Sequence, residues 1–323
     1  MLHTAVCDLL RIAHPIIQAP FGPWSSVELA AAVSNAGGLG SLGAALRSPD
    51  QVREDIALLR ALSVRPFAVN HTMRPFNEAA FAATIAARPP IISAAQGDPG
   101  DLVERAHDAG ILFIQQVHTP QQAEQAAARG VDAIIAQGAE AGGFGGGIST
   151  LTLVPQVVTA VSPLPVIAAG GIADGRGLAA ILALGAQGAN IGTRFLAARE
   201  ASTVPESWKR AILAARSEDA IKVLFADDVF PPAAPGGYPS QPRALRTPFV
   251  EQWNADLDGA HREAERLSGE LLDAIRQGRG HELMPFTGQS AGLIHDILPA
   301  AEIIRTLVNE AAATLQRTAA LTV

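Results

Sequence analysis

The chain has 323 residues, of which 48% are hydrophobic and 17% are charged, a balance that allows a large core and excludes an intrinsically disordered protein. The formal net charge of −7 and the pI near 5.6 give no electrostatic reason to bind nucleic acid or an anionic membrane, so a small-molecule partner is expected. Cys7 is the single cysteine, which excludes an intramolecular disulfide and a cysteine-rich zinc site.

Short apolar runs alternate with helical patterns along the first 195 residues, which is typical of βαβ units around a buried parallel sheet. The predicted strands cover residues 16–19, 39–43, 66–70, 91–94, 112–117, 133–137, 166–169 and 189–192. The predicted helices cover residues 25–36, 49–62, 76–87, 100–109, 120–129, 153–161 and 174–185, the first with Ser25 as N-cap and Glu28 in a capping box. Eight strands with seven intervening helices favour an α/β fold of the (β/α)8 TIM barrel type over a doubly wound sheet.

The regular alternation of apolar runs and helical patterns ends near residue 200. Residues 229–248 are rich in proline and glycine and predict an extended loop, while residues 253–277 have helical spacing with many charges. We expect residues 201–285 to form a cap insertion of helices and loops over the barrel mouth. Residues 1–200 and 286–323 would then make the barrel, with a final helix over residues 299–318 packed against its wall.

No segment of the sequence is typical of a targeting signal or a membrane span. Residues 1–10 lack a basic stretch followed by an apolar core, and they already carry Asp8. The longest uncharged stretch, residues 141–173, is interrupted by glycines and prolines too often for a membrane helix. We therefore expect a cytoplasmic protein.

The residues that follow the predicted strands are the candidates for chemistry, because TIM barrels build their sites at the carboxyl ends of the strands. Most of them are glycines or uncharged polar residues, which suit a planar polar ring better than a metal, and no metal site is predicted. Gly170, Gly171, Gly192 and Thr193 follow the last two strands, where barrels commonly bind phosphate. The structural alternative is that these glycines only make tight turns.

Several motifs resemble the nitronate monooxygenase (2-nitropropane dioxygenase) family of FMN-dependent TIM-barrel flavoproteins. They occur in the family's order and with similar spacing: HPIIQAP at 14–20, AGGLGS at 36–41, AQGAEAGG at 136–143, IAAGGI at 167–172, GAQGA at 185–189 and GTRF at 192–195. The resemblance covers residues 10–200 and returns at GQSAG, residues 288–292, but it is weaker across the insertion. Related enoyl and NADH:quinone reductases share the scaffold.

The resemblance implies an FMN-dependent oxidoreductase that oxidises alkyl nitronates with O2 through the flavin. It implies that Ala19, Pro20 and Phe21 border the flavin ring and that Asn70, Gln116 and Gln137 hydrogen-bond the flavin or its ribityl chain. It further implies that the phosphate is surrounded by Gly143, Gly147, Gly170, Gly171, Gly192 and Thr193. A small-molecule substrate with O2 or NAD(P)H as co-substrate is expected, and a homodimer is left open.

One position departs from the family pattern. Many members have a histidine after the two glycines of the EAGG motif, assigned as the base or as a ligand of the nitro group, whereas this chain has Phe144. Phenylalanine accepts no proton, and a general base contributes ~10²–10⁴-fold where proton transfer is needed. We therefore expect poor turnover of neutral nitroalkanes and retained oxidation of preformed nitronates, with Phe144 as a stacking surface in the catalytic pocket.

Several other residues allow both a catalytic and a structural interpretation. His71 is the candidate replacement base, with a structural hydrogen bond as its alternative, and His118 is a weaker candidate of the same kind. Glu140 is expected to pin the glycine loop through backbone N–H groups. GQSAG matches the G-x-S-x-G pattern of a serine hydrolase, but no strong strand precedes Ser290. An NAD(P)H:quinone or enoyl reductase is the main alternative function, and a non-catalytic flavin-binding protein is the remote one.

Overall fold

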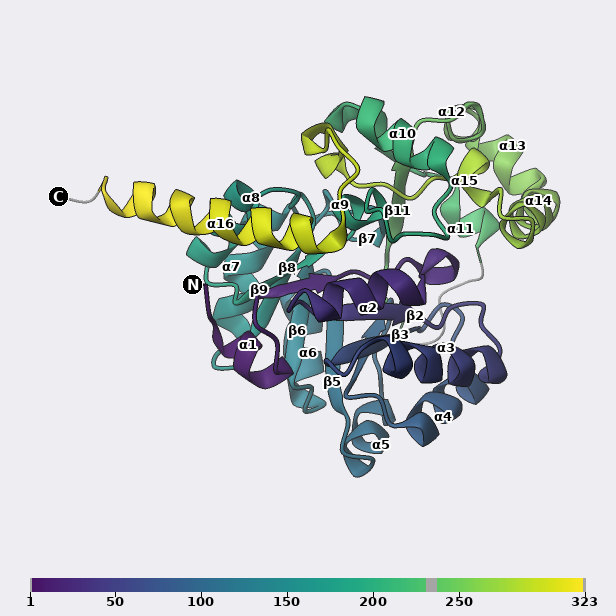
Figure 1. Cartoon of the computed structure of the whole chain (residues 1–323). Coiled ribbons are helices and arrows are strands. Elements are labelled where there is room, and N and C mark those ends of the chain that lie inside the picture. The colour runs from purple at the N-terminus through teal and green to yellow at the C-terminus, as the bar shows by residue number, and fades with distance from the viewer. Residues whose placement is uncertain (1, 231–236, 322–323) are drawn as a thin grey trace.

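The predicted TIM barrel is confirmed by the computed structural model, which describes residues 2–230 and 237–321 (Figure 1). All neighbouring strands of the eight-stranded sheet are parallel, in the order β1-β9-β8-β6-β5-β4-β3-β2, and a parallel bridge between Ile17 and Leu39 joins its two ends. The strands are β1 Ile16–Gln18, β2 Gly40–Gly43, β3 Phe67–Thr72, β4 Ile91–Ala95, β5 Leu112–Val117, β6 Ala133–Gln137, β8 Val166–Ala169 and β9 Gly188–Ile191.

Helices cover the outside of the barrel between consecutive strands. They are α2 Val27–Asn35, α3 Pro49–Leu62, α4 Glu78–Ala87, α5 Leu102–Asp108, α6 Pro120–Ala128, α7 Thr150–Val161 and α8 Gly175–Ala183, with the short η1 Gly22–Trp24 before α2 and α9 Thr193–Leu196 after β9. The predicted cap of α2 was wrong, because the Ser26 hydroxyl accepts the Leu29 N–H while Ser25 serves the loop before the helix. Likewise α4 begins only after Asn77, whose side chain accepts the Ala80 N–H.

The lower interior of the barrel is apolar and is closed from below by α1 Ala5–Leu10, a helix that the sequence pattern did not predict. Val6, Cys7 and Leu10 of this helix are at most 1% exposed. They pack in one cluster with inward side chains of the strands: Ile17, Ala68, Ile91, Ile114, Ala133, Ile135, Ile167 and Ala169. Burial of this aliphatic layer stabilises the barrel by about 25 cal/mol for each Å² of apolar surface removed from water.

The insertion differs in detail from its prediction. It comprises α10 Glu206–Ala214, η2 Ser217–Asp219, β10 Ala220–Lys222, α11 Ala226–Val229, β11 Gln241–Leu245, α12 Pro248–Ala255, α13 Leu257–Arg262, α14 Ala264–Arg276 and α15 Gly280–Leu283. The extended loop predicted over 229–248 therefore contains a strand, and residues 231–236 of that prediction lie outside the described residues. The helix predicted over 253–277 is three helices, because Asp256 caps α13 and the chain turns again at Glu263.

The insertion joins the barrel through a second sheet in the order β10-β11-β7, in which β7 Gly143–Gly145 is the glycine-rich segment after β6. Phe144 pairs with Pro242 in antiparallel register, so the predicted loop over 142–147 holds a strand. In Figure 1 the green helices of the insertion lie together at one end of the barrel. An aliphatic and aromatic cluster of their own, including Phe225, Trp253 and Leu271, is at most 6% exposed and holds them together.

The chain returns to the barrel through η3 Gln289–Leu293 and ends in α16 Ala300–Ala319. As predicted, this last helix packs against the barrel wall, where it contacts α8 and α2 (Figure 1). Ile303, Ile304 and Leu307 form its buried face. Across the described residues, none of the helices combines the length and the apolar character needed to cross a membrane.

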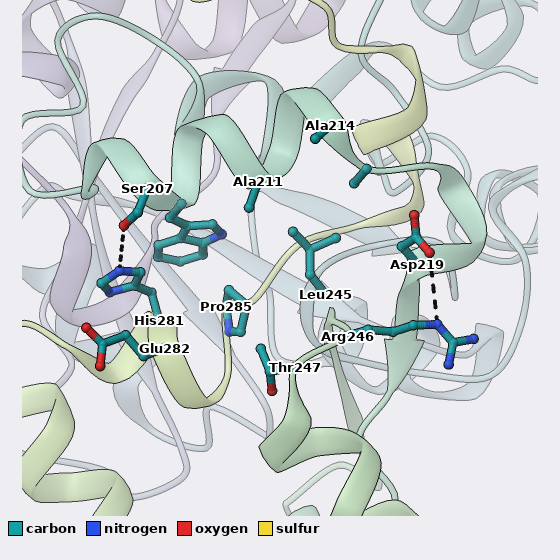
Figure 2. Close-up of a pocket in the computed structure, with 12 residues that line it drawn as sticks. Ser207, Ala211, Ala214, Asp219, Leu245, Arg246, Thr247, His281, Glu282 and Pro285 are labelled. Carbon is teal, nitrogen blue, oxygen red and sulfur yellow. Dashed lines mark hydrogen bonds and ion pairs between the residues drawn. The ribbon is translucent and has the colours of Figure 1, made fainter.

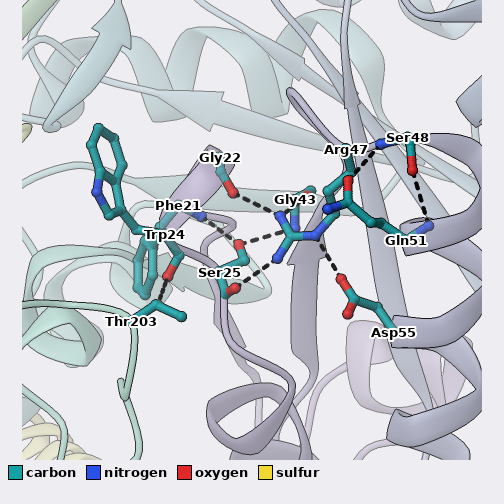
Figure 3. A network of polar contacts seen from close by, with 10 residues as sticks. All are labelled: Phe21, Gly22, Trp24, Ser25, Gly43, Arg47, Ser48, Gln51, Asp55 and Thr203. Carbon is teal, nitrogen blue, oxygen red and sulfur yellow. Dashed lines mark hydrogen bonds and ion pairs between the residues drawn. The ribbon is translucent and has the colours of Figure 1, made fainter. Parts of the chain in front are cut away.

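Arg47 fastens the loop after β1 to the end of β2 (Figure 3). Its guanidinium donates to the carbonyl oxygens of Gly43 at 2.6 Å, Ser25 at 2.8 Å and Gly22 at 3.2 Å. Its Nε–H pairs with Asp55 Oδ2 at 2.6 Å, and only 16% of the side chain is exposed. The planar fork of arginine is what allows one side chain to serve three carbonyls. Arg47 therefore holds the chain that follows Ala19 at the barrel mouth.

We predict that Arg47→Lys destabilises the protein by about 2 kcal/mol, because the ammonium cannot satisfy the three carbonyls and the carboxylate together. The matched control is Arg53→Lys, since Arg53 is 53% exposed and pairs with Asp50 within α3. It should cost less than about 0.5 kcal/mol. Urea unfolding measures both values, and equal losses for the two variants would contradict the role given to Arg47.

Candidate active site

A ring of polar side chains lies above the apolar layer of the barrel. Side chains alternate along a strand, so the residues two positions beyond the inward aliphatic ones also point inward, nearer the carboxyl ends. The strand register pairs Asn70 with Ser93, and Asn190 with both Ala169 and Ile17. The resulting ring comprises Ser41, Asn70, Ser93, Gln116, Gln137 and Asn190. It includes the three amides predicted from the sequence.

Only part of this ring is satisfied by protein contacts. Asn70 Nδ2 donates to Ser93 Oγ at 3.0 Å, and Gln116 Nε2 donates to Gln137 Oε1 at 3.1 Å. Ser41 Oγ and Asn190 Oδ1 are buried and have no hydrogen-bond partner among the residues that the structure describes. Because a buried polar group without a partner is costly, the ring is suited to a ligand that supplies donors and acceptors. Sequence reasoning missed Ser41 and Asn190, although the period of two along β2 and β9 would have found them.

The loops after β8 and β9 bring the predicted phosphate residues to the same end of the barrel. Gly170 and Gly171 have φ of +102° and +75°, a conformation that side chains other than glycine rarely adopt. A Cβ at Gly170 would lie 2.9 Å from Thr150 Oγ1, so the backbone approaches closely there. Thr193 Oγ1 accepts the Gly288 N–H at 2.9 Å, which docks the GQSAG segment against the β9 loop. Ala19 adjoins Gly192 on the other side.

Glu140 has a structural role, but its carboxylate holds the start of α7 instead of the N–H groups of the glycine loop that were expected from the sequence. Its carboxylate accepts the Thr150 N–H at 2.9 Å and the Thr150 hydroxyl at 2.8 Å, at the first turn of α7. A carboxylate is favourable at a helix N-terminus, where backbone N–H groups are unsatisfied. The Glu140 carbonyl also accepts the Gln289 N–H, so the residue ties the glycine-rich segment to GQSAG. Gly147, by contrast, is exposed, and Gly143 has open space where its Cβ would be.

GQSAG does not form a nucleophile elbow. Ser290 lies in the 3-10 helix η3 with only 6% of its surface exposed, and no strand leads into it. A Cβ at Gly288 would lie 2.8 Å from Glu140 O and from Gly142 N. The motif therefore needs glycine at Gly288 for close packing of two backbones.

Phe144 lies in an aromatic cluster at the barrel mouth. Its ring contacts Phe230 edge to face at a centroid distance of 4.9 Å and lies 6.0 Å from Phe286. The guanidinium of Arg74, two residues beyond the end of β3, stands 5.5 Å from the Phe144 ring centre, a cation–π distance. Arg74 also pairs with Asp227 of α11 at 2.8 Å, and its own side chain is 4% exposed. The site thus has a cation beside Phe144.

Two further cations reach the mouth from the insertion. Lys222 Nζ donates to the carbonyl oxygens of Gln241 at 2.9 Å and Gly146 at 3.2 Å, and Arg243 Nη2 donates to Ala139 O at 2.8 Å. Burial and the charge of Arg243 lower the Lys222 pKa to about 8. No local pattern singled these residues out, because β11 meets β7 only through tertiary pairing.

The two candidate histidines lie in different surroundings. His71 points outward from β3, with Nε2 2.9 Å from Thr84 Oγ1 and its ring 5.2 Å from that of Phe81 on α4. Burial lowers the His71 pKa to about 4. This geometry favours its structural alternative over a catalytic role. His118 is instead brought to the polar ring, where its Nε2 lies 2.9 Å from Gln137 Oε1.

A groove lies on the insertion, lined by α10 and by residues 245–247 and 281–285. It measures about 620 Å³, and Ala211, Leu245 and Pro285 are among the residues that line it (Figure 2). Ser207 and His281 face each other at 3.0 Å at one end. The candidate active site lies instead at the carboxyl ends of the strands, where the polar side chains converge on the interior of the barrel.

Comparison with known proteins agrees with the motifs. The family model described as nitronate monooxygenase matches residues 3–82 and 77–310. A nitronate monooxygenase of Paraburkholderia phytofirmans is 34% identical, with 95% of this chain and 94% of that protein aligned. The (3aS,4S,5R,7aS)-5-hydroxy-7a-methyl-1-oxo-octahydro-1H-indene-4-carboxyl-CoA dehydrogenase of Mycobacterium tuberculosis is 31% identical, with 99% of both chains aligned.

Among solved structures, FabK from Thermotoga maritima superposes with a TM-score of 0.90 at 33% identity, covering 99% of this chain and 100% of the other. The family match, the full-length relatives and the shared barrel lead to one conclusion. The chain is an oxidoreductase that belongs to the nitronate monooxygenase family.

Proposed function

We propose that the protein binds FMN across the barrel mouth and oxidises alkyl nitronates with O2. Members of the family are in general flavin-dependent. The observation that carries the proposal is the partly unsatisfied polar ring, with Ser41 and Asn190 beside three amides. Such a ring fits a planar ligand edged with hydrogen-bond donors and acceptors. When bound, the flavin supplies the redox chemistry, while the protein supplies position and electrostatics.

FMN fits better than a dinucleotide flavin. The loops with Gly170, Gly171, Gly192 and Thr193 offer one cradle of backbone N–H groups and a hydroxyl, which suits a single phosphate. The sequence carries no pyrophosphate fingerprint for an adenine dinucleotide. In this proposal Ala19, Pro20 and Phe21 border the ring, and residues 201–285 act as the cap.

The surroundings of Phe144 favour a substrate that is already an anion. Phenylalanine cannot take a proton from a neutral nitroalkane, whereas the Arg74 guanidinium beside it carries a positive charge that the Asp227 carboxylate compensates in part. A preformed nitronate has lost that proton and carries the charge that arginine recognises. His71 is turned toward Thr84, so we do not assign it as a replacement base.

A reductase is the second candidate function. Two of the full-length relatives are FabK and a dehydrogenase of a carboxyl-CoA compound, and the Phe144 cluster offers an apolar wall for an enoyl or quinone substrate. In that case NAD(P)H, rather than the nitronate, would donate electrons to the flavin. A flavin-binding protein without catalysis is the remote alternative.

Anaerobic mixing distinguishes these functions. The protein is mixed with propyl-2-nitronate and, separately, with NADH or NADPH, while the flavin absorbance is followed. We expect the nitronate to change the flavin spectrum rapidly and O2 to restore it, with little change from either nicotinamide. Rapid bleaching by NADH or NADPH would favour the reductase, and a yellow protein inert to all three would favour the non-catalytic role.

We predict that Gly171→Asp abolishes FMN binding, because its side chain and negative charge would enter the space proposed for the phosphate. Gly110→Asp is the matched control. Gly110 has nearly the same φ, +73° against +75°, and also has room for a side chain, but it lies at the opposite end of the strands. Fluorescence titration with FMN measures both. Retained affinity in the Gly171 variant, or an equal loss in the control, would count against this placement of the phosphate.

Phe144→His is predicted to raise the rate on a neutral nitroalkane by about tenfold or more, within the ~10²–10⁴-fold that a general base contributes. The adjacent Arg74 charge would keep the imidazole neutral and able to accept a proton. The rate on the matching preformed nitronate should change much less. The measurement is a pair of O2-consumption assays with both forms of one nitro compound.

Phe144→Leu is the control, because it also loses the ring but gains no proton acceptor. It should show no gain on the neutral form. Equal changes on both substrate forms in the histidine variant, or efficient turnover of the neutral form by the parent, would indicate that another group already acts as base.

A further inference from the structure

Three side chains on adjacent strands form a short hydrogen-bonded row at the polar ring. Gln137 Oε1 on β6 is approached by Gln116 Nε2 at 3.1 Å and by His118 Nε2 at 2.9 Å. His118 is 1% exposed, and its own backbone N–H is held by Gln122 Oε1 at 2.7 Å. The family motifs assigned no role to His118, and the proposed chemistry does not use it.

The row determines which nitrogen of His118 carries the proton. An amide oxygen only accepts, so His118 Nε2 must donate to Gln137 Oε1. Reversing the Gln137 amide alone would set its NH2 against the NH2 of Gln116, so the row requires the two amides in the orientation that the structure gives them. The Nε2–H tautomer is therefore the one that this contact requires.

The groups around His118 keep it neutral near pH 7. Burial and the positive charge of Lys222 lower its pKa, and the hydrogen bond to Gln137 opposes them, which leaves the pKa at about 4. His118 Nδ1 is buried and has no hydrogen-bond partner among the described residues. The Tyr238 ring packs against the His118 ring at a centroid distance of 6.3 Å and contributes no charge there. A neutral imidazole here has one N–H to give, and Gln137 receives it.

The orientation of the Gln137 amide also determines where its NH2 group points. With Oε1 turned toward both donors, Gln137 Nε2 is directed away from them and donates to none of the described residues. We propose that His118 is a positioning residue, which holds the Gln137 amide so that its NH2 faces the barrel mouth and donates to the acceptor edge of the flavin. The inference deepens the proposed function and rests on it for the identity of the ligand.

The first test is FMN affinity of the flavin-depleted full chain, measured by fluorescence titration. His118→Phe keeps the ring volume but removes the donor, and it should weaken FMN binding about tenfold, the effect of one hydrogen bond. His118→Gln supplies an amide N–H at the same reach and should recover affinity to within about threefold of the parent. His14→Phe, at the opposite end of the barrel, is the control and should leave affinity within about twofold. Equal losses for the Phe and Gln variants at His118 would overturn the proposal, because His118 would then act only by filling space.

The second test does not depend on the flavin. Nitrogen NMR of histidine-labelled protein should show His118 as the Nε2–H tautomer, neutral down to about pH 5. Gln137→Glu keeps an acceptor for both donors but loses the NH2, so it should raise the His118 pKa above its ordinary 6.5 and abolish FMN binding. The Nδ1–H tautomer, or an unchanged His118 pKa in that variant, would overturn the positioning role. If the parent itself binds no FMN, the proposed function and this ligand both fail, and the NMR result still decides whether His118 orients Gln137.

Discussion

The architecture of the site depends on the alternation of side chains along parallel strands in a closed sheet. Closing the sheet turns one face of every strand inward, so residues two apart on the same strand lie in successive layers of the interior. In β6 this places Ile135 in the apolar layer and Gln137 in the polar ring. The lower layer, sealed by α1, provides stability, and the upper layer, open at the carboxyl ends, provides chemistry. A step of two residues along a strand therefore leads from the layer that stabilises the fold to the layer that forms the site.

The insertion supplies contacts that hold residues at the barrel mouth in place. β11 pairs with β7 and so fixes Phe144 at the mouth, while α11 supplies Asp227 to the Arg74 guanidinium. Phe144, Phe230 and Phe286 come from three distant parts of the chain, and their edge contacts add to the burial of their rings. The mouth is thereby apolar on the side of Phe144, with the Arg74 guanidinium facing the ring. Under the proposed function, this combination would make proton abstraction a poor fit at Phe144.

Local signals in the sequence predicted most of the barrel and part of the site. Glycine pairs such as Gly170 and Gly171 marked tight turns, and strand-terminal amides such as Gln137 marked the ring, because both depend on a few consecutive residues. The sequence predictions were wrong where residues distant in the sequence offer alternative hydrogen-bond partners. Ser25 has the sequence of an N-cap, yet its hydroxyl accepts N–H groups from Phe21 and Gly43, and Ser26 caps the helix instead. The proline-rich stretch before Pro248 did not indicate β11, because the strand that β11 pairs with, β7, lies about a hundred residues earlier in the chain.

The sequence by itself determined the eight strands and the seven helices between them, the glycines that the loops require and the absence of a proton acceptor at Phe144, since each follows from residue type and short-range spacing. Only the tertiary structure decided which side chains share the mouth. It turned His71 toward Thr84 and His118 toward Gln137, although both follow or end a strand and carry the same chemistry. It also brought Lys222 and Arg243 against the glycine-rich segment. The physical reason is that strand register and long-range pairing set the direction of each side chain, and neither is encoded within a few neighbouring residues.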